Sequence, residues 1–179
     1  MTAGVMWFRA RSIRRYHLQT KEPQLSTSID RVRQALLEAG TDTTIHTFDK
    51  STHTAEEAAR AVGCALGQIV KSLVFVAAGQ PVLLLVSGAN RVDVTAVGKL
   101  FGCTLHRPDA NTVKTVTGFS IGGVPPIGHA RTLRTFVDRD LTSYDVVWAA
   151  AGAPTSVFPI SPTELLRITN GEPISVAPE

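Results

Sequence analysis

A lysine lies inside a strongly apolar segment of the chain. The run Ile69-Val70-Lys71-Ser72-Leu73-Val74-Phe75 has the composition of a buried β-strand, and Lys71 is its one charged residue. Burying an ammonium group without partners is costly, so this position suggests a specific role. One role is to present a cation to an anionic ligand, such as a phosphate or a developing oxyanion. The alternative is a lysine whose stem packs against the sheet while its ammonium reaches water.

A loop rich in glycine and proline follows later in the chain. Its sequence, Gly122-Gly123-Val124-Pro125-Pro126-Ile127-Gly128-His129, is incompatible with a helix or a central strand. Adjacent glycines let the backbone approach a ligand closely and point N–H groups at an oxyanion. The two prolines then fix the shape of the chain. This composition suits a rigid binding rim, and an ordinary surface turn is the alternative.

Three further residues have positions suited to a site. His129, at the end of the loop, could orient water, donate to a carbonyl or contact a ribose, or it could serve only the structure. Asp138 ends an apolar run, where carboxylates often reach a site; a salt bridge to Arg134 or Arg139 is the simpler alternative. Gly152 follows another apolar run and either lets a ligand sit against the strand end or turns the chain.

Other kinds of site find little support, and we do not expect a serine hydrolase. No His-Glu-x-x-His zinc motif, phosphate-binding Gly-Lys-Ser/Thr loop or dinucleotide-binding Gly-x-Gly-x-x-Gly pattern is present. His46 and His53 lack the helical spacing of a metal pair. Cys64 and Cys103 follow no metal or redox spacing and are expected to be small core residues. The expected site therefore uses no metal and no cofactor.

The composition predicts one globular domain whose positive charge is concentrated at its start. The 179 residues, 44% hydrophobic and 18% charged, suffice to bury a core. The net charge is +3, but residues 1–27 hold five basic residues against one acidic residue, so the remainder sums to −1. We expect residues 1–27 to be a basic extension, either disordered or contacting an RNA backbone. Because the chain shows no apolar run long enough for a bilayer and no signal-peptide pattern, we expect a cytoplasmic protein.

Capping residues and hydrophobic periodicity predict helices interspersed with strands. The helices are expected to begin at or near Ser28, Thr54, Asp93, Asp109 and Ser161. The strands are expected at 43–48, 69–77, 82–86, 135–138, 146–151 and 156–160. The second and third of these flank Gly79-Gln80-Pro81 and should form an antiparallel hairpin, and their almost continuous apolar sequence predicts cover on both faces. Interspersed helices with at least one hairpin predict an α+β domain with a mixed sheet.

Four of these segments occur in the order found in one protein family. The chain resembles the YbaK and prolyl-tRNA-synthetase-associated editing domains, which are aminoacyl-tRNA deacylases. The segment around Lys71 is similar to the family's lysine strand, and Gly122 to Pro126 matches its Gly-x-x-x-Pro loop. The segments 135–138 and 148–152 are similar to the strands that follow.

The resemblance implies a fold, an activity and a substrate. The fold would be a single α+β domain over residues 28–175, with a mixed, partly barrel-like sheet surrounded by helices. The activity would be hydrolysis of the ester joining an amino acid to the terminal ribose of tRNA. The substrates would be mischarged tRNAs, above all tRNA for proline carrying alanine, cysteine or another small amino acid, and prolyl-tRNA synthetase could be a partner. Such a second sieve is needed because a pocket separates amino acids differing by one methylene by only about 1–3 kcal/mol.

The resemblance also implies roles for individual residues. Lys71 would bind the terminal phosphate or ribose, and N–H groups around Gly122 and Gly123 would hold the aminoacyl carbonyl and stabilise its oxyanion. Pro126 would stiffen the loop, and His129 matches a histidine found after the loop in some members. Substrate contacts are expected from Phe48, Ser72, Val124, Pro125, Pro126, Asp138 and Gly152. No protein nucleophile is needed, because an aminoacyl ester is already activated and a ribose hydroxyl can help position water.

Two positions depart from the family's pattern. Phe48 stands where some members have tyrosine, so it can pack against the substrate or the terminal adenine but cannot hydrogen-bond. Ala150-Ala151-Gly152 stands where cysteinyl-specific members carry Ser-Gly-Gly, which shifts the expected amino acid from cysteine toward alanine or one similarly small.

Two alternative functions stay open. One is a non-catalytic module that docks on aminoacyl-tRNA or on a synthetase, and retained tRNA binding without turnover would favour it. The other is hydrolysis of an unrelated small aminoacyl ester or amide, and insensitivity to the tRNA body would favour that.

Overall fold

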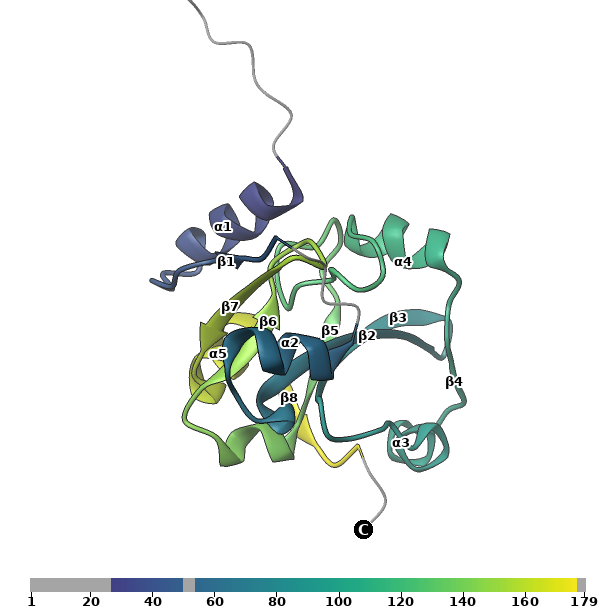
Figure 1. Cartoon of the computed structure of the whole chain (residues 1–179). Coiled ribbons are helices and arrows are strands. Elements are labelled where there is room, and N and C mark those ends of the chain that lie inside the picture. Colours follow the sequence, from purple (N-terminus) through teal and green to yellow (C-terminus); the bar gives the residue numbers. More distant parts are fainter. Residues whose placement is uncertain (1–26, 50–53, 177–179) are drawn as a thin grey trace, which may run out of the picture.

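The computed structural model describes residues 27–49 and 54–176, and the predicted extension therefore lies, except for Thr27, outside the described residues. Five α-helices and an eight-stranded mixed sheet form one α+β domain, which confirms the predicted fold class (Figure 1). The helices are α1 (Ser28–Glu38), α2 (Ala55–Val62), α3 (Val94–Phe101), α4 (Ala110–Thr117) and α5 (Pro162–Thr169), with 3-10 turns η1 (Leu66–Gln68) and η2 (Arg139–Ser143). The strands are β1 (His46–Thr47), β2 (Ile69–Ala77), β3 (Gln80–Ser87), β4 (Leu105–His106), β5 (Arg134–Asp138), β6 (Val147–Ala150), β7 (Ser156–Ile160) and β8 (Glu172–Ile174).

Side-chain caps begin each of the helices where the sequence predicts them. Thr54 and Glu57 form a capping box at α2, and the side chains of Asp93, Asp109 and Ser161 cap α3, α4 and α5. At α1 the cap is Thr27, one residue before the predicted start. Each cap satisfies backbone N–H groups that the first helical turn leaves unpaired. The helix boundaries thus follow from local chemistry.

Strand β2 lies at the centre of the sheet. The strand order is β1-β7-β6-β2-β3-β5-β8, with β4 paired to β2 outside this path. The predicted hairpin is present as β2 and β3, but its turn is Ala78-Gly79, with both residues at positive φ, as a tight two-residue hairpin turn requires. Pro81 therefore lies inside β3 and not in the turn.

The edge of β2 that faces away from β3 is paired only near its two ends. Strand β6 pairs in parallel with Ile69 and Val70, and β4 pairs antiparallel with Val76 and Ala77. Between these pairs, residues 71–75 have no partner strand on this edge among the residues that the structure describes. The sheet therefore has a notch beside the segment that carries Lys71.

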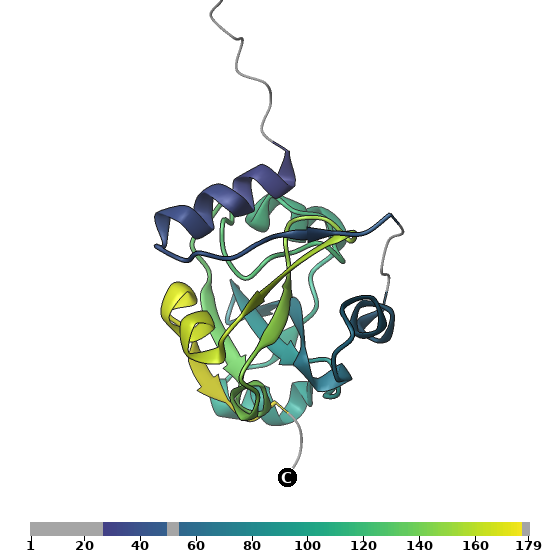
Figure 2. The same ribbon diagram turned by 60° about the vertical axis from the view of Figure 1, so that its left-hand side comes forward.

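Helices cover both faces of the β2–β3 hairpin, as its apolar sequence predicts. On one face, Val70, Val74, Leu83 and Leu85 belong to a core shared with side chains of α1, α4 and α5. On the other face, Phe75 and its neighbours pack with α3 and β4. In Figures 1 and 2, α1 lies along the segment that contains β1. These two cores hold β2 rigidly in the middle of the domain.

A few predicted core positions differ from expectation. Leu37, placed on the buried stripe of α1, is 63% exposed, whereas Val32 and Leu36 of that helix are buried. Cys64 and Cys103 are half-buried at the margins of the cores. Among the described helices, none is long and apolar enough to cross a membrane.

Candidate active site

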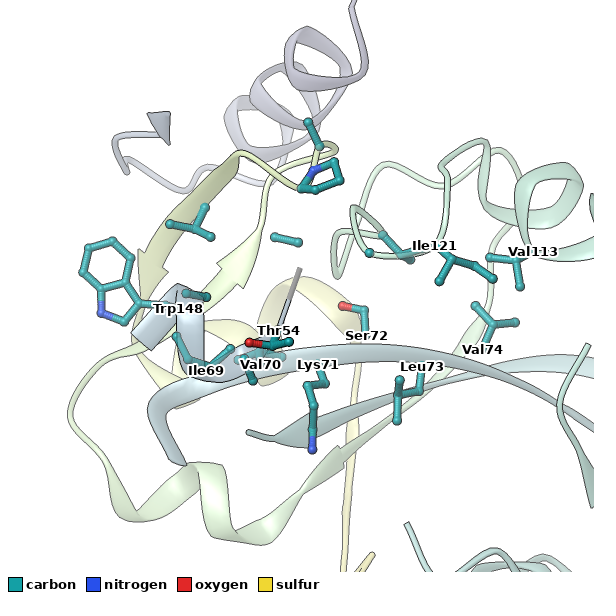
Figure 3. A pocket seen from close by; sticks show the side chains of 18 of the residues that line it. Thr54, Ile69, Val70, Lys71, Ser72, Leu73, Val74, Val113, Ile121 and Trp148 are labelled. Atoms are coloured by element: carbon teal, nitrogen blue, oxygen red, sulfur yellow. The ribbon is translucent and has the colours of Figure 1, made fainter. Parts of the chain in front are cut away.

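A cavity of about 340 Å³ opens at the notch beside β2 (Figure 3). Its walls come from the start of α2, from residues 69–75 of β2, from the segment after β4, from the glycine-rich loop and from the β6–β7 hairpin. The lining residues are Thr54, Ala55, Ala58, Ile69, Val70, Lys71, Ser72, Leu73, Val74, Phe75, Arg107, Pro108, Val113, Ile121, Gly122, Val124, Trp148, Ala150, Ala153, Pro154, Ser156 and Val157. A mostly apolar wall with few polar groups is typical of a small-molecule site.

Lys71 and Ser72 leave β2 on opposite sides, as neighbours in a strand must (Figure 3). The Ser72 hydroxyl oxygen is buried and has no hydrogen-bond partner among the described residues. A buried hydroxyl without a partner loses free energy relative to one in water, and native proteins rarely leave one. Its position in a cavity wall is what a ligand-binding hydroxyl requires.

The ammonium group of Lys71 is held by main-chain oxygens. It donates to the carbonyl of Gly88 at 3.1 Å and to the carbonyl of Asn90. Burial lowers the pKa of Lys71, and Glu56 and Asp138 oppose this shift electrostatically. An ammonium has three N–H donors, so two carbonyls leave one for a further acceptor. The sheet thus fixes a cation in the cavity wall.

Asp138 holds the loop that holds Lys71. The carboxylate is only 2% exposed and does not line the cavity. Its Oδ2 accepts from the Ser87 N–H at 3.0 Å and from the Asn90 side-chain amide at 2.8 Å, and Asn90 also donates to Asp140 at 2.7 Å. Arg134, a candidate salt-bridge partner for Asp138, instead pairs with Glu172.

The glycine-rich loop packs tightly against the turn between β6 and β7. A Cβ at Gly123 would lie 2.9 Å from the Cα of Ala153, so only glycine allows this approach. Gly122 has φ +88° and lines the cavity together with Val124, whereas Gly123, Pro125 and Pro126 do not line it. Gly123 therefore allows the close packing of the loop, whereas Gly122 forms part of the cavity wall.

The backbone donors of this loop are not equivalent. The Gly123 N–H, one of the predicted oxyanion donors, donates to the Ser120 carbonyl at 3.0 Å and is committed to the turn. No acceptor among the described residues pairs with the N–H groups of Gly122 and Val124. The donors that remain for a ligand are therefore those of Gly122 and Val124.

His129 supports the loop from behind and does not line the cavity. Its Nε2 lies 2.7 Å from the Pro125 carbonyl oxygen, and its ring meets Phe119 edge-on with the centroids 6.2 Å apart. Because a carbonyl only accepts, Nε2 must carry the proton. Burial lowers the pKa of His129, and the bond to Pro125 opposes the shift.

Phe48 and Gly152 also lie outside the cavity lining. The Phe48 N–H donates to the Thr155 carbonyl at 2.8 Å and extends the β1–β7 ladder. Gly152 has φ +93°, and a Cβ there would lie 2.6 Å from the carbonyl oxygen of Ser28. The close approach that requires glycine at this position is therefore the start of α1.

Sequence reasoning missed two residues of the site. Arg107 is an exposed cation in the cavity wall, with its guanidinium 5.5 Å from the centre of the Phe75 ring. Asn90 holds Lys71 through its main-chain carbonyl. Every residue has such a carbonyl, so the residue type at this position does not indicate the contact. For Arg107, its place next to Pro108, just before the capped start of α4, was the available signal.

The sequence contains the Gly-x-Ser-x-Gly pattern that is typical of serine hydrolases. Gly118-Phe119-Ser120-Ile121-Gly122 matches Gly-x-Ser-x-Gly, a motif that works only as a sharp turn from a strand into a helix. Here the serine follows helix α4, is exposed and does not line the cavity. Because the motif here lacks the turn from a strand into a helix, it does not have the structure of a serine-hydrolase site. Among the described residues, no cluster of three or more His, Cys, Asp or Glu side chains is placed to hold a metal.

Comparisons with known proteins identify related editing proteins. Residues 49–168 match the family described as the aminoacyl-tRNA editing domain. YwhH of Bacillus subtilis is 32% identical over 139 residues, which cover 77% of this chain and 88% of YwhH. EbsC of Enterococcus faecalis, described as a candidate Cys-tRNA(Pro)/Cys-tRNA(Cys) deacylase, is 28% identical over 66% of this chain and 73% of its own length.

Two further matches involve proline. The proline–tRNA ligase of Nitratidesulfovibrio vulgaris is 33% identical over 97 residues, which cover 54% of this chain but 17% of the ligase. The crystal structure of a candidate trans-editing enzyme for prolyl tRNA synthetase superimposes with a TM-score of 0.82 at 43% identity, over 87% of this chain and 100% of that one.

Proposed function

This chain belongs to the aminoacyl-tRNA editing-domain family, and from this premise we propose that it is a trans-editing deacylase that hydrolyses mischarged tRNA in the cytoplasm. The proposed substrates are tRNAs for proline that carry alanine, cysteine or another small amino acid. The relatives that act on or belong to the prolyl system support this choice. Prolyl-tRNA synthetase is the proposed partner, since it would produce such substrates.

The observation that carries the proposal is the unpartnered Ser72 hydroxyl in the cavity wall. An aminoacyl ester combines a small side chain with several hydrogen-bonding groups. The cavity offers the complementary surfaces: small or apolar walls, such as Ala150 and Val74, beside a polar atom that the protein leaves unsatisfied. A volume of about 340 Å³ suits an aminoacyl group and part of its ribose.

Main-chain donors and a fixed cation would stabilise the reacting ester. We assign the aminoacyl carbonyl and its oxyanion to the N–H groups of Gly122 and Val124, because the Gly123 N–H is committed to Ser120. We assign the terminal phosphate or ribose to Lys71, whose remaining N–H is available. Arg107 supplies a second cation for the RNA end.

The remaining residues of the proposed site act through the loop and the strand ends. His129, Pro125 and Pro126 keep the shape that presents Gly122. Asp138 keeps Lys71 in place through Asn90, and Gly152 sets the path of the β6–β7 turn that the loop packs against. Water attacks the ester, and a ribose hydroxyl positions it, so the proposal requires no protein nucleophile.

Clearance of a panel of aminoacyl-tRNAs tests the proposal. Alanyl-, cysteinyl-, seryl- and prolyl-tRNA for proline are incubated with the full chain, and the ester that remains is followed over time. We expect at least one mischarged species to be cleared and prolyl-tRNA to be spared. Binding of these tRNAs without clearance of any would favour the non-catalytic docking module, and equal clearance of simple aminoacyl esters would favour a general esterase.

A further inference from the structure

The main chain of β2 presents alternate residues to its two edges. The Gly88 N–H donates to the Ile69 carbonyl at 2.7 Å, in line with the register that pairs Val70 with Ser87. In an antiparallel pair, every second residue exchanges hydrogen bonds with its partner strand. Lys71 and Leu73 therefore bond to β3, whereas Ser72 and Val74 turn their N–H and C=O groups to the other edge.

That other edge is the notch. The ladder with β6 stops at Val70, and the ladder with β4 stops at Val76. Pro108 stands where the next rung of the β4 ladder would reach the Val74 carbonyl, and proline has no N–H to donate. No main-chain partner for Ser72 or Val74 occurs on this edge within residues 27–49 and 54–176.

We propose that this unpaired edge binds the α-ammonium group of the aminoacyl moiety, through the carbonyl oxygen of Ser72 and the Ser72 hydroxyl. The inference rests on the proposed function and adds how the amino acid itself is recognised. The ladders with β6 and β4 close this edge at both ends.

The other side chains that line the cavity offer few acceptors for a cation. No aspartate or glutamate lines the described part of the cavity, so an ammonium must be held by neutral oxygens. The Thr54 hydroxyl already accepts from the Glu57 N–H, and Ser156 lies 3.5 Å from the Thr47 hydroxyl. The carbonyl and the hydroxyl of Ser72 offer two acceptors on one residue, and an ammonium has three donors for them.

The first test compares alanyl-tRNA with lactyl-tRNA, in which a hydroxyl replaces the ammonium and the size is almost unchanged. Each rate is divided by the spontaneous hydrolysis rate of the same ester, because the ammonium itself activates its ester. We expect kcat/KM for lactyl-tRNA to be lower by about tenfold or more, as the loss of a hydrogen bond to a charged group predicts. Equal normalised rates overturn the inference and leave the deacylase proposal standing; absence of clearance of either ester overturns both.

The second test locates the ammonium on β2. The probes are 3′-deoxyadenosines that carry alanine or lactate through a non-hydrolysable 3′-amide, and their binding is followed by inhibition of alanyl-tRNA clearance. We expect the alanyl probe to inhibit more tightly and to shift the ¹³C carbonyl resonance of Ser72. The carbonyls of Lys71 and Leu73, which face β3, are the internal controls. Equal inhibition by the two probes, or shifts confined to other carbonyls, overturns the assignment.

Discussion

The Asp138 carboxylate accepts a hydrogen bond from the Asn90 side chain at 2.8 Å, and the main-chain carbonyl of the same Asn90 accepts one from Lys71. A buried acid at the end of β5 is therefore linked to the cation of β2 through one residue. Asp138 does not touch the cavity, yet it sets the position of a group that does. Asp138, which was expected to contact the substrate, is therefore better described as acting on the site indirectly, through Lys71.

Asp138→Asn should weaken both the fold and the activity. Asp138 Oδ1 accepts from the Asp140 N–H at 3.2 Å, and Oδ2 accepts from the Ser87 N–H and the Asn90 amide. An asparagine has an NH2 group in place of one of these oxygens, so at least one donor loses its acceptor. We expect the free energy of unfolding to fall by about 1–3 kcal/mol in denaturant titrations. We also expect kcat/KM for deacylation to fall, since the Lys71 ammonium, assigned to the terminal phosphate or ribose, shifts while the cavity stays. Asp140→Asn, on the exposed side of the same network, is the matched control. If both variants behave alike, Asp138 has no special role in placing Lys71.

Ser72→Ala and Ser87→Ala should separate function from stability. Within the described part of the chain the Ser72 hydroxyl has no hydrogen-bond partner to lose, so its replacement should leave the free energy of unfolding almost unchanged and lower deacylation by about tenfold. The buried Ser87 hydroxyl donates to the Gly67 carbonyl at 2.8 Å, so its replacement should cost about 1–3 kcal/mol of stability. Denaturant titration and single-turnover clearance measure the two effects. A large loss of stability in Ser72→Ala would show that this hydroxyl serves the fold.

His129 should make the protein less stable in mild acid. Burial lowers the pKa of His129 below its usual 6.5, so the unfolded state binds the proton more readily than the folded state. The folded state is therefore progressively disfavoured as the pH falls through 6.5, and above that value the effect vanishes. We expect His129→Gln, which keeps a donor for the Pro125 carbonyl, to lose less melting temperature between pH 7.5 and pH 5.5 than the wild type. Identical losses in the two proteins would mean that His129 titrates alike when folded and unfolded.

Gly123→Ala should damage the site more than a glycine replacement elsewhere. The new Cβ would meet the Ala153 backbone at 2.9 Å and push the loop from the β6–β7 turn, at a cost of about 1–3 kcal/mol. Displacing the loop moves the Gly122 N–H, so deacylation should fall as well. Gly79→Ala, in the open β2–β3 turn at φ +77°, should lose about 1–2 kcal/mol from backbone strain alone and keep its activity per folded molecule. Equal activity losses in both variants would contradict this account of the loop.

Much of the fold can be predicted from the sequence, because local chemistry decides it. Thr54, Asp93, Asp109 and Ser161 cap helices wherever they precede a helical pattern. The apolar run around Lys71 could only be a covered strand. By contrast, the short strands β4 and β8 were not predicted, since two or three residues show no periodicity. The parallel pairing of β2 with β6 also depends on contacts between segments distant in sequence.

The sequence predicts where the site lies better than it predicts which atoms are available to a ligand. The sequence points to Lys71, Ser72, Gly122 and Val124, and all four line one cavity. It could not reveal that the Gly123 N–H is used by a turn, or that Asn90 holds the lysine through its main chain. Main-chain groups have the same chemistry in every residue, so only the folded path shows which of them are free.

Clearance of alanyl-tRNA for proline by the wild type and by Lys71→Ala tests the central claim most directly. The two proteins are compared at equal concentration of folded chain, in EDTA, with prolyl-tRNA for proline as the reference ester. We predict that the wild type clears the alanyl ester at least about tenfold faster than Lys71→Ala, as the loss of a charge-assisted contact implies, and that it spares the prolyl ester. Equal clearance by the two proteins, or none by the wild type, would contradict the account.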